Sequence, residues 1–146
     1  MQLTSHQASD ADVAFLLDVF VRAMRPHISA ARGSWDEHKE QSQFLEQLQV
    51  QDTKIIRYDG EPVGFVMTVP SGPDVELHTL CIAPEHQGHG LGSAVTRQLI
   101  DDCRQRGVGL VLSVLRANTG ARALYERLGF VVTEASPSHY RMRFVS

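Results

Sequence analysis

The sequence lacks the features that mark several specialised classes of protein. Its 146 residues contain only two cysteines, Cys81 and Cys103, and each lies inside an apolar stretch. Such cysteines favour buried thiols in a reducing compartment over a disulfide framework. The formal net charge of −3 leaves no basic excess for binding nucleic acid. We therefore expect a cytoplasmic protein without a nucleic-acid partner.

Long hydrophobic runs are missing as well. No stretch of about 18 apolar residues occurs, and the first ten residues, MQLTSHQASD, are too polar for a signal peptide. We therefore expect no membrane partner. Hydrophobic residues make up 42% and charged residues 21%, the usual composition of a folded globular protein. A chain of this length fills one compact domain, so we expect a single domain over residues 1–146.

The apolar spacing near the N-terminus predicts two helices. The first is expected to run from a cap at Ser9 or Asp10 to Pro26, where proline should end it. Residues 27–35 are expected to form a loop, and residues 36–49 a polar second helix. The inward face of that second helix is limited to Phe44, Leu45 and Leu48.

The rest of the chain alternates between strand and helix patterns. Strands are expected at residues 53–58, 62–69, 75–83, 108–115, 130–135 and 139–145, and helices at 91–106 and 118–130. Asp59-Gly60 predicts a hairpin turn between the first two strands. The order ααβββαβαββ predicts a single α/β domain with a helical crossover between the central strands.

A glycine-rich turn, PEHQGHGLGSA at residues 84–94, lies between an expected strand and an expected helix. A helix start presents unpaired N–H groups and the positive end of the helix dipole, which together can hold an anion. Gly88, Gly90 and Gly92 leave no Cβ between those amides and a phosphate. The turn therefore predicts a pyrophosphate site, although such turns also use glycine for geometry alone.

Two familiar phosphate-binding motifs do not fit this turn. A Walker loop needs Gly-Lys-Ser/Thr, and residues 84–94 contain no lysine. A dinucleotide-binding fold needs an acidic residue at the end of the next strand, which here ends in Arg116. A nucleotide-binding domain is therefore disfavoured.

Residues 76–130 resemble the acetyl-CoA-binding core of the GNAT superfamily of N-acyltransferases. The family's phosphate loop follows the pattern Arg/Gln-x-x-Gly-x-Gly/Ala, which residues 87–92 match. The family's second signature is matched about 30 residues later; its residues here are Asn118, Ala121, Tyr125 and Gly129-Phe130. The resemblance implies a GNAT-like α/β (α+β) domain, in which a mixed central sheet is splayed between two parallel strands and carries helices on both faces.

The resemblance also implies an N-acetyltransferase that uses acetyl-CoA as co-substrate and needs no metal. The backbone of three strand residues would pair with the pantetheine arm, the amides of the turn would hold the pyrophosphate, and an asparagine would meet the pantetheine from the far side. The coenzyme-binding residues implied are Leu80, Cys81, Ile82, Gln87, Gly88, His89, Gly90, Leu91, Gly92, Ser93, Asn118 and Tyr125.

The same resemblance suggests an acid and a base. Tyr125 stands where the family usually keeps the acid that protonates the departing thiolate. Glu76 stands where many members place a general base, often acting through water, and His78 is an alternative base or relay on the same face of a regular strand. A backbone amide near Ile82 is expected to stabilise the oxyanion. The plainer interpretations, a packed tyrosine and a solvated carboxylate, stay open.

The acceptor side is less defined by the sequence. Arg25 and Trp35, with His78, are the expected substrate-binding residues, although solvated arginines and a packed tryptophan fit as well. We expect a small-molecule or peptide amine as acceptor, and the family resemblance allows a homodimer. A non-catalytic CoA-binding sensor on the same fold is the alternative function.

A metal site is not expected. His78, Cys81, His86 and His89 have a spacing that superficially suits metal ligands. However, positions 78 and 81 differ by an odd number and so point to opposite faces of a regular strand.

Overall fold

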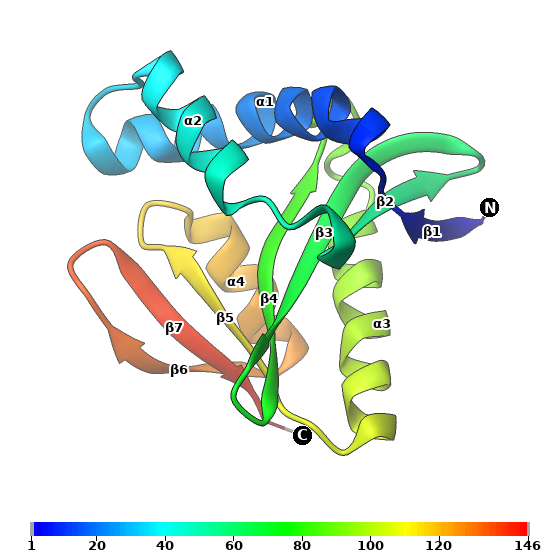
Figure 1. Ribbon diagram of the computed structural model, residues 1–146. Helices are drawn as coiled ribbons and strands as arrows, with labels where there is room; N and C mark the ends of the chain where they lie inside the picture. The colour runs from blue at the N-terminus through cyan, green and yellow to red at the C-terminus, as the bar shows by residue number, and fades with distance from the viewer. Residues whose placement is uncertain (1, 146) are drawn as a thin grey trace.

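The structure, a computed structural model, describes residues 2–145 and shows one mixed sheet covered by helices (Figure 1). The seven strands lie in the order β1-β2-β3-β4-β5-β7-β6. They are β1 (Leu3–Gln7), β2 (Thr53–Tyr58), β3 (Glu61–Ser71), β4 (Asp74–Ile82), β5 (Leu110–Leu115), β6 (Phe130–Ala135) and β7 (His139–Phe144). The α-helices of the described chain are α1 (Val13–Arg32), α2 (Glu37–Gln47), α3 (Leu91–Arg106) and α4 (Thr119–Leu128).

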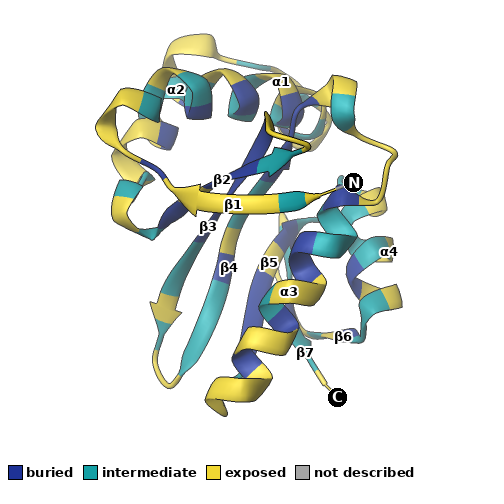
Figure 2. Ribbon diagram, turned by 90° about the vertical axis from the view of Figure 1, so that its right-hand side faces the viewer, coloured by how far each residue is buried: buried dark blue, intermediate teal, exposed yellow. Residues whose placement is uncertain are grey.

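The two faces of the sheet carry separate hydrophobic cores. Helices α1 and α2 cover one face, and α3 and α4 cover the other (Figures 1 and 2). The first core joins Leu16 and Val19 of α1 to Phe65 of β3. The second, larger core joins Leu112 of β5 to residues of α3 and to Tyr125 of α4. The expected α/β domain with helices on both faces is therefore confirmed.

The sheet is splayed between β4 and β5. This parallel pair is joined at three positions, which end at Leu77 opposite Leu112. Beyond that point β4 continues to Ile82 and β5 to Leu115, but these ends are not paired with each other. The strands thus form a V that opens toward their carboxyl ends (Figure 1), and the expected splay between two parallel strands is confirmed.

A β-bulge interrupts β4 at the closed end of this V. Met67 of β3 lies opposite Thr79, whereas the next residue of β3, Thr68, lies opposite Leu77. One residue of β4, His78, is therefore left over between two paired positions. A bulge of this kind bends a strand and re-aims the side chain of the extra residue.

The first helix extends past Pro26 to Arg32, so the prediction that proline ends it was wrong. Of the loop expected at residues 27–35, only residues 33–35 lie outside the helices. Pro26 lies on the exposed side of α1, where the lost backbone hydrogen bond costs least. Ile28, two residues later, is buried and holds the last turns against the fold. The helix ends instead at Gly33, whose left-handed φ of 76° suits a glycine cap.

Two further expectations about the N-terminal region need correction. Strand β1 was missed because its residues are polar, as suits an exposed edge strand. The inward face of α2 was only partly right: Phe44 is buried, but Leu45 is 44% exposed and the second buried residue is Glu40. By contrast, the predicted bounds of helix 91–106 and of strand 130–135 are confirmed.

The close packing of β3 on β4 leads to a stability prediction. A Cβ on Gly64 would lie 2.1 Å from the carbonyl oxygen of Cys81, a backbone atom that cannot move aside. Gly64→Ala should therefore lower the free energy of unfolding by roughly 3 kcal/mol, the upper range for overpacking. Gly120→Ala is the matched control, because no atom lies within 4 Å of its added Cβ and its φ is ordinary. Urea unfolding should show that control unchanged or slightly more stable, and equal midpoints for the two variants would contradict the prediction.

Candidate active site

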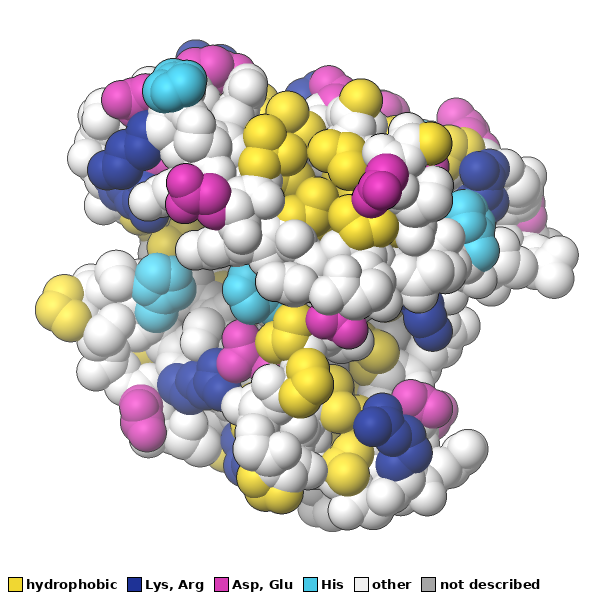
Figure 3. Space-filling view, viewed as in Figure 1, with side chains coloured by type: hydrophobic (Ala, Val, Ile, Leu, Met, Phe, Trp, Pro, Cys, Tyr) yellow, Lys and Arg dark blue, Asp and Glu magenta, His cyan; other side chains and the backbone are white. Residues whose placement is uncertain are grey.

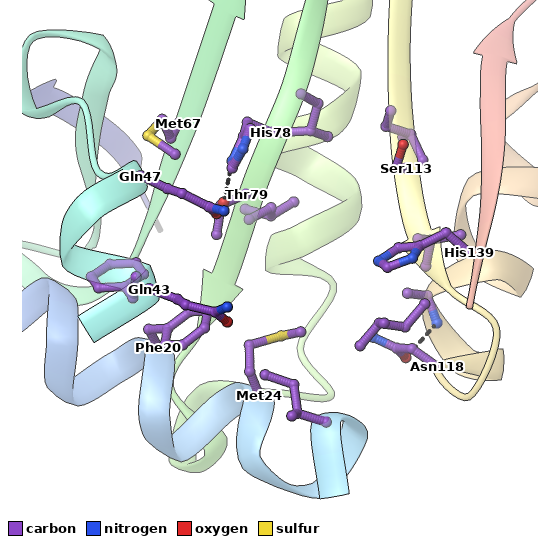
Figure 4. A pocket seen from close by; sticks show the side chains of 18 of the residues that line it. Phe20, Met24, Gln43, Gln47, Met67, His78, Thr79, Ser113, Asn118 and His139 are labelled. Carbon is purple, nitrogen blue, oxygen red and sulfur yellow. Dashed lines mark hydrogen bonds between the residues drawn. The ribbon is translucent and has the colours of Figure 1, made fainter. Parts of the chain in front are cut away.

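A cavity of about 370 Å³ opens between the α1–α2 layer and the splayed ends of β4 and β5. Figure 4 shows Phe20 and Met24 of α1 on one side of it and Ser113, Asn118 and His139 on the other. In the space-filling view, histidine side chains lie along the hollow below the helical layer (Figure 3). The splay of the sheet thus creates a recess that both helical layers and the strand ends line.

The glycine turn leads from the open end of the V into α3. The backbone N–H groups of residues 88–93 make no hydrogen bond within the described chain, and the first bonded amide is that of Ala94, which donates to the Gly90 oxygen. Gly88 and Gly90 have φ angles of 82° and 77°, and no atom lies within 4 Å of an added Cβ at either residue. The turn therefore presents free donors to open space at the positive end of a helix.

Gln87 fastens this turn to the strand before it. Its Nε2 donates a hydrogen bond of 2.9 Å to the carbonyl oxygen of Ile82. Leu80, Cys81 and Ile82 pair with β3 on one edge, while their other edge faces the open V. The structure thus brings the free turn amides and an unpaired strand edge to adjoining positions.

Two predicted residues of α4 line the cavity. Tyr125 is 8% exposed, and its burial raises the pKa of the phenol from the ordinary 10.0 to about 12. The nearby Cys81 thiol is also buried, and burial raises its pKa to about 12. Asn118 caps α4 through a 3.2 Å hydrogen bond that its Oδ1 accepts from the Ala121 amide (Figure 4). A protonated phenol and an asparagine Nδ2 group therefore face the cavity from the α4 side.

The predicted base, Glu76, does not line the cavity. Its Oε1 accepts a hydrogen bond of 2.8 Å from Nη1 of Arg141, which also donates to Ser113 Oγ. The carboxylate is therefore engaged in an ion pair with β7, at a side-chain exposure of 21%. His78, two residues later, does line the cavity.

The expected acceptor residues of α1 and its loop lie apart from the cavity. Arg25 stacks over the Trp35 ring at 5.7 Å and lies 3.8 Å from Glu37, and neither Arg25 nor Trp35 lines the cavity. Trp35 donates its indole N–H to the same Glu37 carboxylate. This grouping ties the α1–α2 loop to the start of α2.

Sequence reasoning missed an ion pair in the cavity wall. Glu40 of α2 is 5% exposed and accepts a hydrogen bond from Nη1 of Arg32, and both residues line the cavity. The signal was available in the sequence, because Glu40 lies four residues before the buried Phe44 and so shares its helix face. A buried carboxylate on that face needed a partner, and Arg32 supplies it.

Comparison with known proteins identifies the family. A model of the acetyltransferase (GNAT) family matches residues 12–130. This chain belongs to the GNAT family. Its relatives include the [ribosomal protein bS18]-alanine N-acetyltransferase of Escherichia coli K12, 38% identical over 73 residues, which are 49% of this chain and 49% of the relative. Mycothiol acetyltransferase of Corynebacterium glutamicum is 32% identical over 108 residues, 71% of this chain and 37% of that protein. The chain thus spans about half, or less, of the length of these relatives.

Solved structures show the GNAT fold over the whole chain. The PaiA N-acetyltransferase of Thermoplasma acidophilum, in complex with coenzyme A, superposes with a TM-score of 0.81 at 18% identity and covers all of both chains. The ribosomal-protein-S18-alanine N-acetyltransferase of Escherichia coli superposes with a TM-score of 0.73 at 22% identity, covering 98% of this chain and 93% of that one.

Residues 2–145 contain neither a membrane-spanning helix nor a cluster of metal-ligating side chains. None of the helices there has the length and apolarity to cross a membrane. No three His, Cys, Asp or Glu side chains of this part of the chain gather so that they could hold a metal ion.

The burial of Tyr125 makes a testable prediction about its ionisation. Removing the phenolate from water raises its pKa, so Tyr125 should ionise with a midpoint near pH 12 in the folded protein. The stabilisation gained from the neutral phenol is present below its ordinary pKa and is lost as the pH rises through the folded value. The difference in phenolate absorbance between wild type and Tyr125→Phe isolates this group. A midpoint near 10, with circular dichroism still native, would contradict the prediction.

Proposed function

We propose that this protein transfers an acetyl group from acetyl-CoA to a primary amine, with residues 1–146 acting as one N-acetyltransferase domain. The observation that carries the proposal is the open V of β4 and β5, which adjoins the free amides of residues 88–93 and is faced by Tyr125. Membership of the GNAT family and the coenzyme A complex of the similar PaiA enzyme support it.

The donor side would use mainly backbone groups. The pyrophosphate would accept hydrogen bonds from the amides of residues 88–93, where the α3 dipole also favours negative charge. The pantetheine arm carries amide groups, so it can pair with the free edge of Leu80, Cys81 and Ile82 as an added strand does. Asn118 would donate its Nδ2 group from the opposite side of the V.

The chemistry requires a base, an oxyanion site and an acid. The amine nitrogen attacks the thioester carbonyl carbon, the new C–N bond forms and the C–S bond breaks. The oxygen that gains charge would be stabilised by a backbone amide of the free β4 edge, near Ile82. The thiolate would take its proton from Tyr125, which its raised pKa keeps protonated at neutral pH.

Glu76, the base expected from the family, could act only through water. It does not line the cavity, and its carboxylate is held by Arg141. A water in the V could still carry a proton to it, as the family resemblance suggests.

The acceptor is proposed to be a small molecule or peptide with a free amine. The named relatives include enzymes for an alanine of ribosomal protein bS18 and for mycothiol, so both classes occur among proteins similar to this one. The walls that would select the acceptor are those of α1 and α2, which contribute Phe20, Met24, Gln43 and the Arg32–Glu40 pair.

The glycine turn provides a paired test of coenzyme binding. Gly90→Ala places a side chain at a φ of 77°, so the turn must change conformation and its amides lose their common direction. We expect CoA affinity to fall at least about 10-fold, measured by isothermal titration calorimetry, since about 1.4 kcal/mol of lost hydrogen bonding produces that change. Gly92→Ala lies in α3 with free space around it and should keep the affinity. Equal affinities for the two variants would show that the turn does not bind the coenzyme.

Turnover itself is tested by thiol release. Acetyl-CoA should release free CoA when mixed with the protein and one of several amines: amino acids, spermidine, an aminoglycoside or a short peptide that begins with alanine. Tyr125→Phe keeps the ring contact with Phe130 but removes the acid, so kcat should fall about 100-fold. Tight CoA binding without turnover on any amine would support a sensor, and absence of CoA binding would remove the proposal.

A further inference from the structure

We infer that His78 is the group that takes the proton of the attacking amine, with Thr79 as the residue that positions its ring. The inference rests on the proposed transferase function and assigns its base to a residue inside the cavity. It replaces the longer route through water to Glu76.

Few ionisable groups line the cavity. They are Arg32 of α1, Glu40 of α2, His78 of β4, Tyr125 of α4 and His139 of β7. Arginine stays protonated and the buried phenol serves as the acid, so neither accepts a proton at neutral pH. Glu40 is held by Arg32 in the helical wall, away from the strands that would hold the thioester. Among the described residues that line the cavity, the two histidines therefore remain as bases.

The two histidines lie at different depths. His139 lies beside Asn118, near the open end of the V where the pantetheine would enter (Figure 4). His78 lies next to Leu77, the last residue of β4 that pairs with β5, and so at the closed end. The acetyl group is the terminus of the coenzyme's arm, so with the pyrophosphate at residues 88–93 it would reach deepest into the V. His78 would therefore be the histidine at the level of the reacting carbon.

The bulge gives His78 an orientation that a regular strand would not. Successive side chains of a regular strand point to opposite faces, so His78 and Thr79 should not meet. In the structure His78 Nδ1 lies 2.8 Å from Thr79 Oγ1, and Figure 4 shows both side chains beside Gln47 on the α2 side of β4. The extra residue between the pairs Met67–Thr79 and Thr68–Leu77 makes this contact. Bulges that re-aim a side chain recur next to active sites.

The contact with Thr79 engages Nδ1 and leaves Nε2 as the other ring nitrogen, without a protein partner among the hydrogen bonds of the described chain. When Nδ1–H donates to Thr79 Oγ1, Nε2 carries the lone pair and can accept a proton. A base whose other nitrogen is fixed by a hydroxyl has the arrangement that oriented catalytic bases need. The side chain is exposed, so the protonated ring can return its proton to water.

The proton balance is complete with these residues. The ammonium of the acceptor loses one proton to His78 Nε2, and the free amine attacks the carbonyl carbon. The tetrahedral intermediate collapses as the C–S bond breaks, and the sulfur takes a proton from Tyr125. As the intermediate collapses, the amine nitrogen loses its second proton. This proton passes through water to Tyr125, which is thereby reprotonated. The products are an amide, free CoA and one proton released from His78.

The experiment measures acetyl-CoA cleavage by wild type, His78→Ala and Glu76→Gln. The nucleophiles are spermidine, a short peptide that begins with alanine, and water alone. Loss of the base should lower kcat about 100-fold in His78→Ala, while CoA affinity by calorimetry stays as in wild type. Added imidazole should restore much of the lost rate in His78→Ala, after subtraction of its reaction with acetyl-CoA without enzyme. His38→Gln removes an exposed imidazole of α2 and should change nothing.

Thr79 supplies a second, independent variant set. Thr79→Val removes the hydroxyl without changing the shape, and should lower kcat with little effect on KM. Thr79→Ser keeps the hydroxyl and should restore the rate. Failure of the serine variant to do so would show that the hydroxyl does not position the ring.

The outcomes separate this inference from the proposed function. If wild type fails to cleave acetyl-CoA with every one of these nucleophiles, water included, both the proposed function and the role of His78 are overturned. If wild type is active and His78→Ala retains its rate, only the role of His78 is overturned. A rate loss that imidazole does not restore, or a loss in Glu76→Gln alone, also overturns it and leaves the transferase intact.

Discussion

The end of hydrogen bonding between β4 and β5, at Leu77 and Leu112, is the constraint on which the site depends. Unpaired backbone groups in a sheet interior are costly, so the strands would tend either to close up or to separate further. Ion pairs from β7 hold the closed end in place. Arg143 donates to Asp74 at 2.8 Å, Asp74 accepts the Gly109 amide at 3.2 Å, and Arg141 binds Glu76. The neighbouring Arg143 also lowers the pKa of Asp74, which keeps this carboxylate charged.

The ion pairs Arg143–Asp74 and Arg141–Glu76 together form a clamp between β7 and β4. This clamp explains why an acidic residue at position 76 need not be catalytic. Glu76 and Asp74 lie two residues apart on β4, and each pairs with an arginine of β7 across the intervening strand β5. The repeated arrangement has a structural purpose, since it fixes β4 against β7 just before the sheet opens. The bulge then follows at once and turns His78 toward the cavity. Clamp, bulge and free strand edge therefore succeed one another along nine residues of β4.

The sequence was sufficient for most of the fold, whereas the donor side of the site stays a prediction from its motifs. Local signals are strong in the second half of the chain: helix α3 lies between glycines, and β5 is apolar except for Ser113. The errors arose where tertiary contacts override local preference. Pro26 is tolerated because α1 keeps burying residues after it. Strand β1 is a polar edge that pairs with β2 through its backbone and through side-chain hydrogen bonds of His6 and Gln7. The bulge was beyond prediction because it is a mismatch between two strands, and alternation within β4 alone gives no sign of it.

A sequence motif indicates the proposed donor side but not the acceptor side, and this difference has a physical origin. The proposed donor groups are turn amides and a strand edge, which require only glycines and a helix start at fixed positions, so a short sequence motif can indicate them. The proposed acceptor wall consists of side chains of α1 and α2, including the buried Glu40 and its partner Arg32. Loss of Arg32 would leave the buried Glu40 carboxylate unpaired, so a change of Arg32 requires a change of Glu40 as well. Acceptor choice can thus diverge through paired substitutions in two helices while the V and its clamp stay the same.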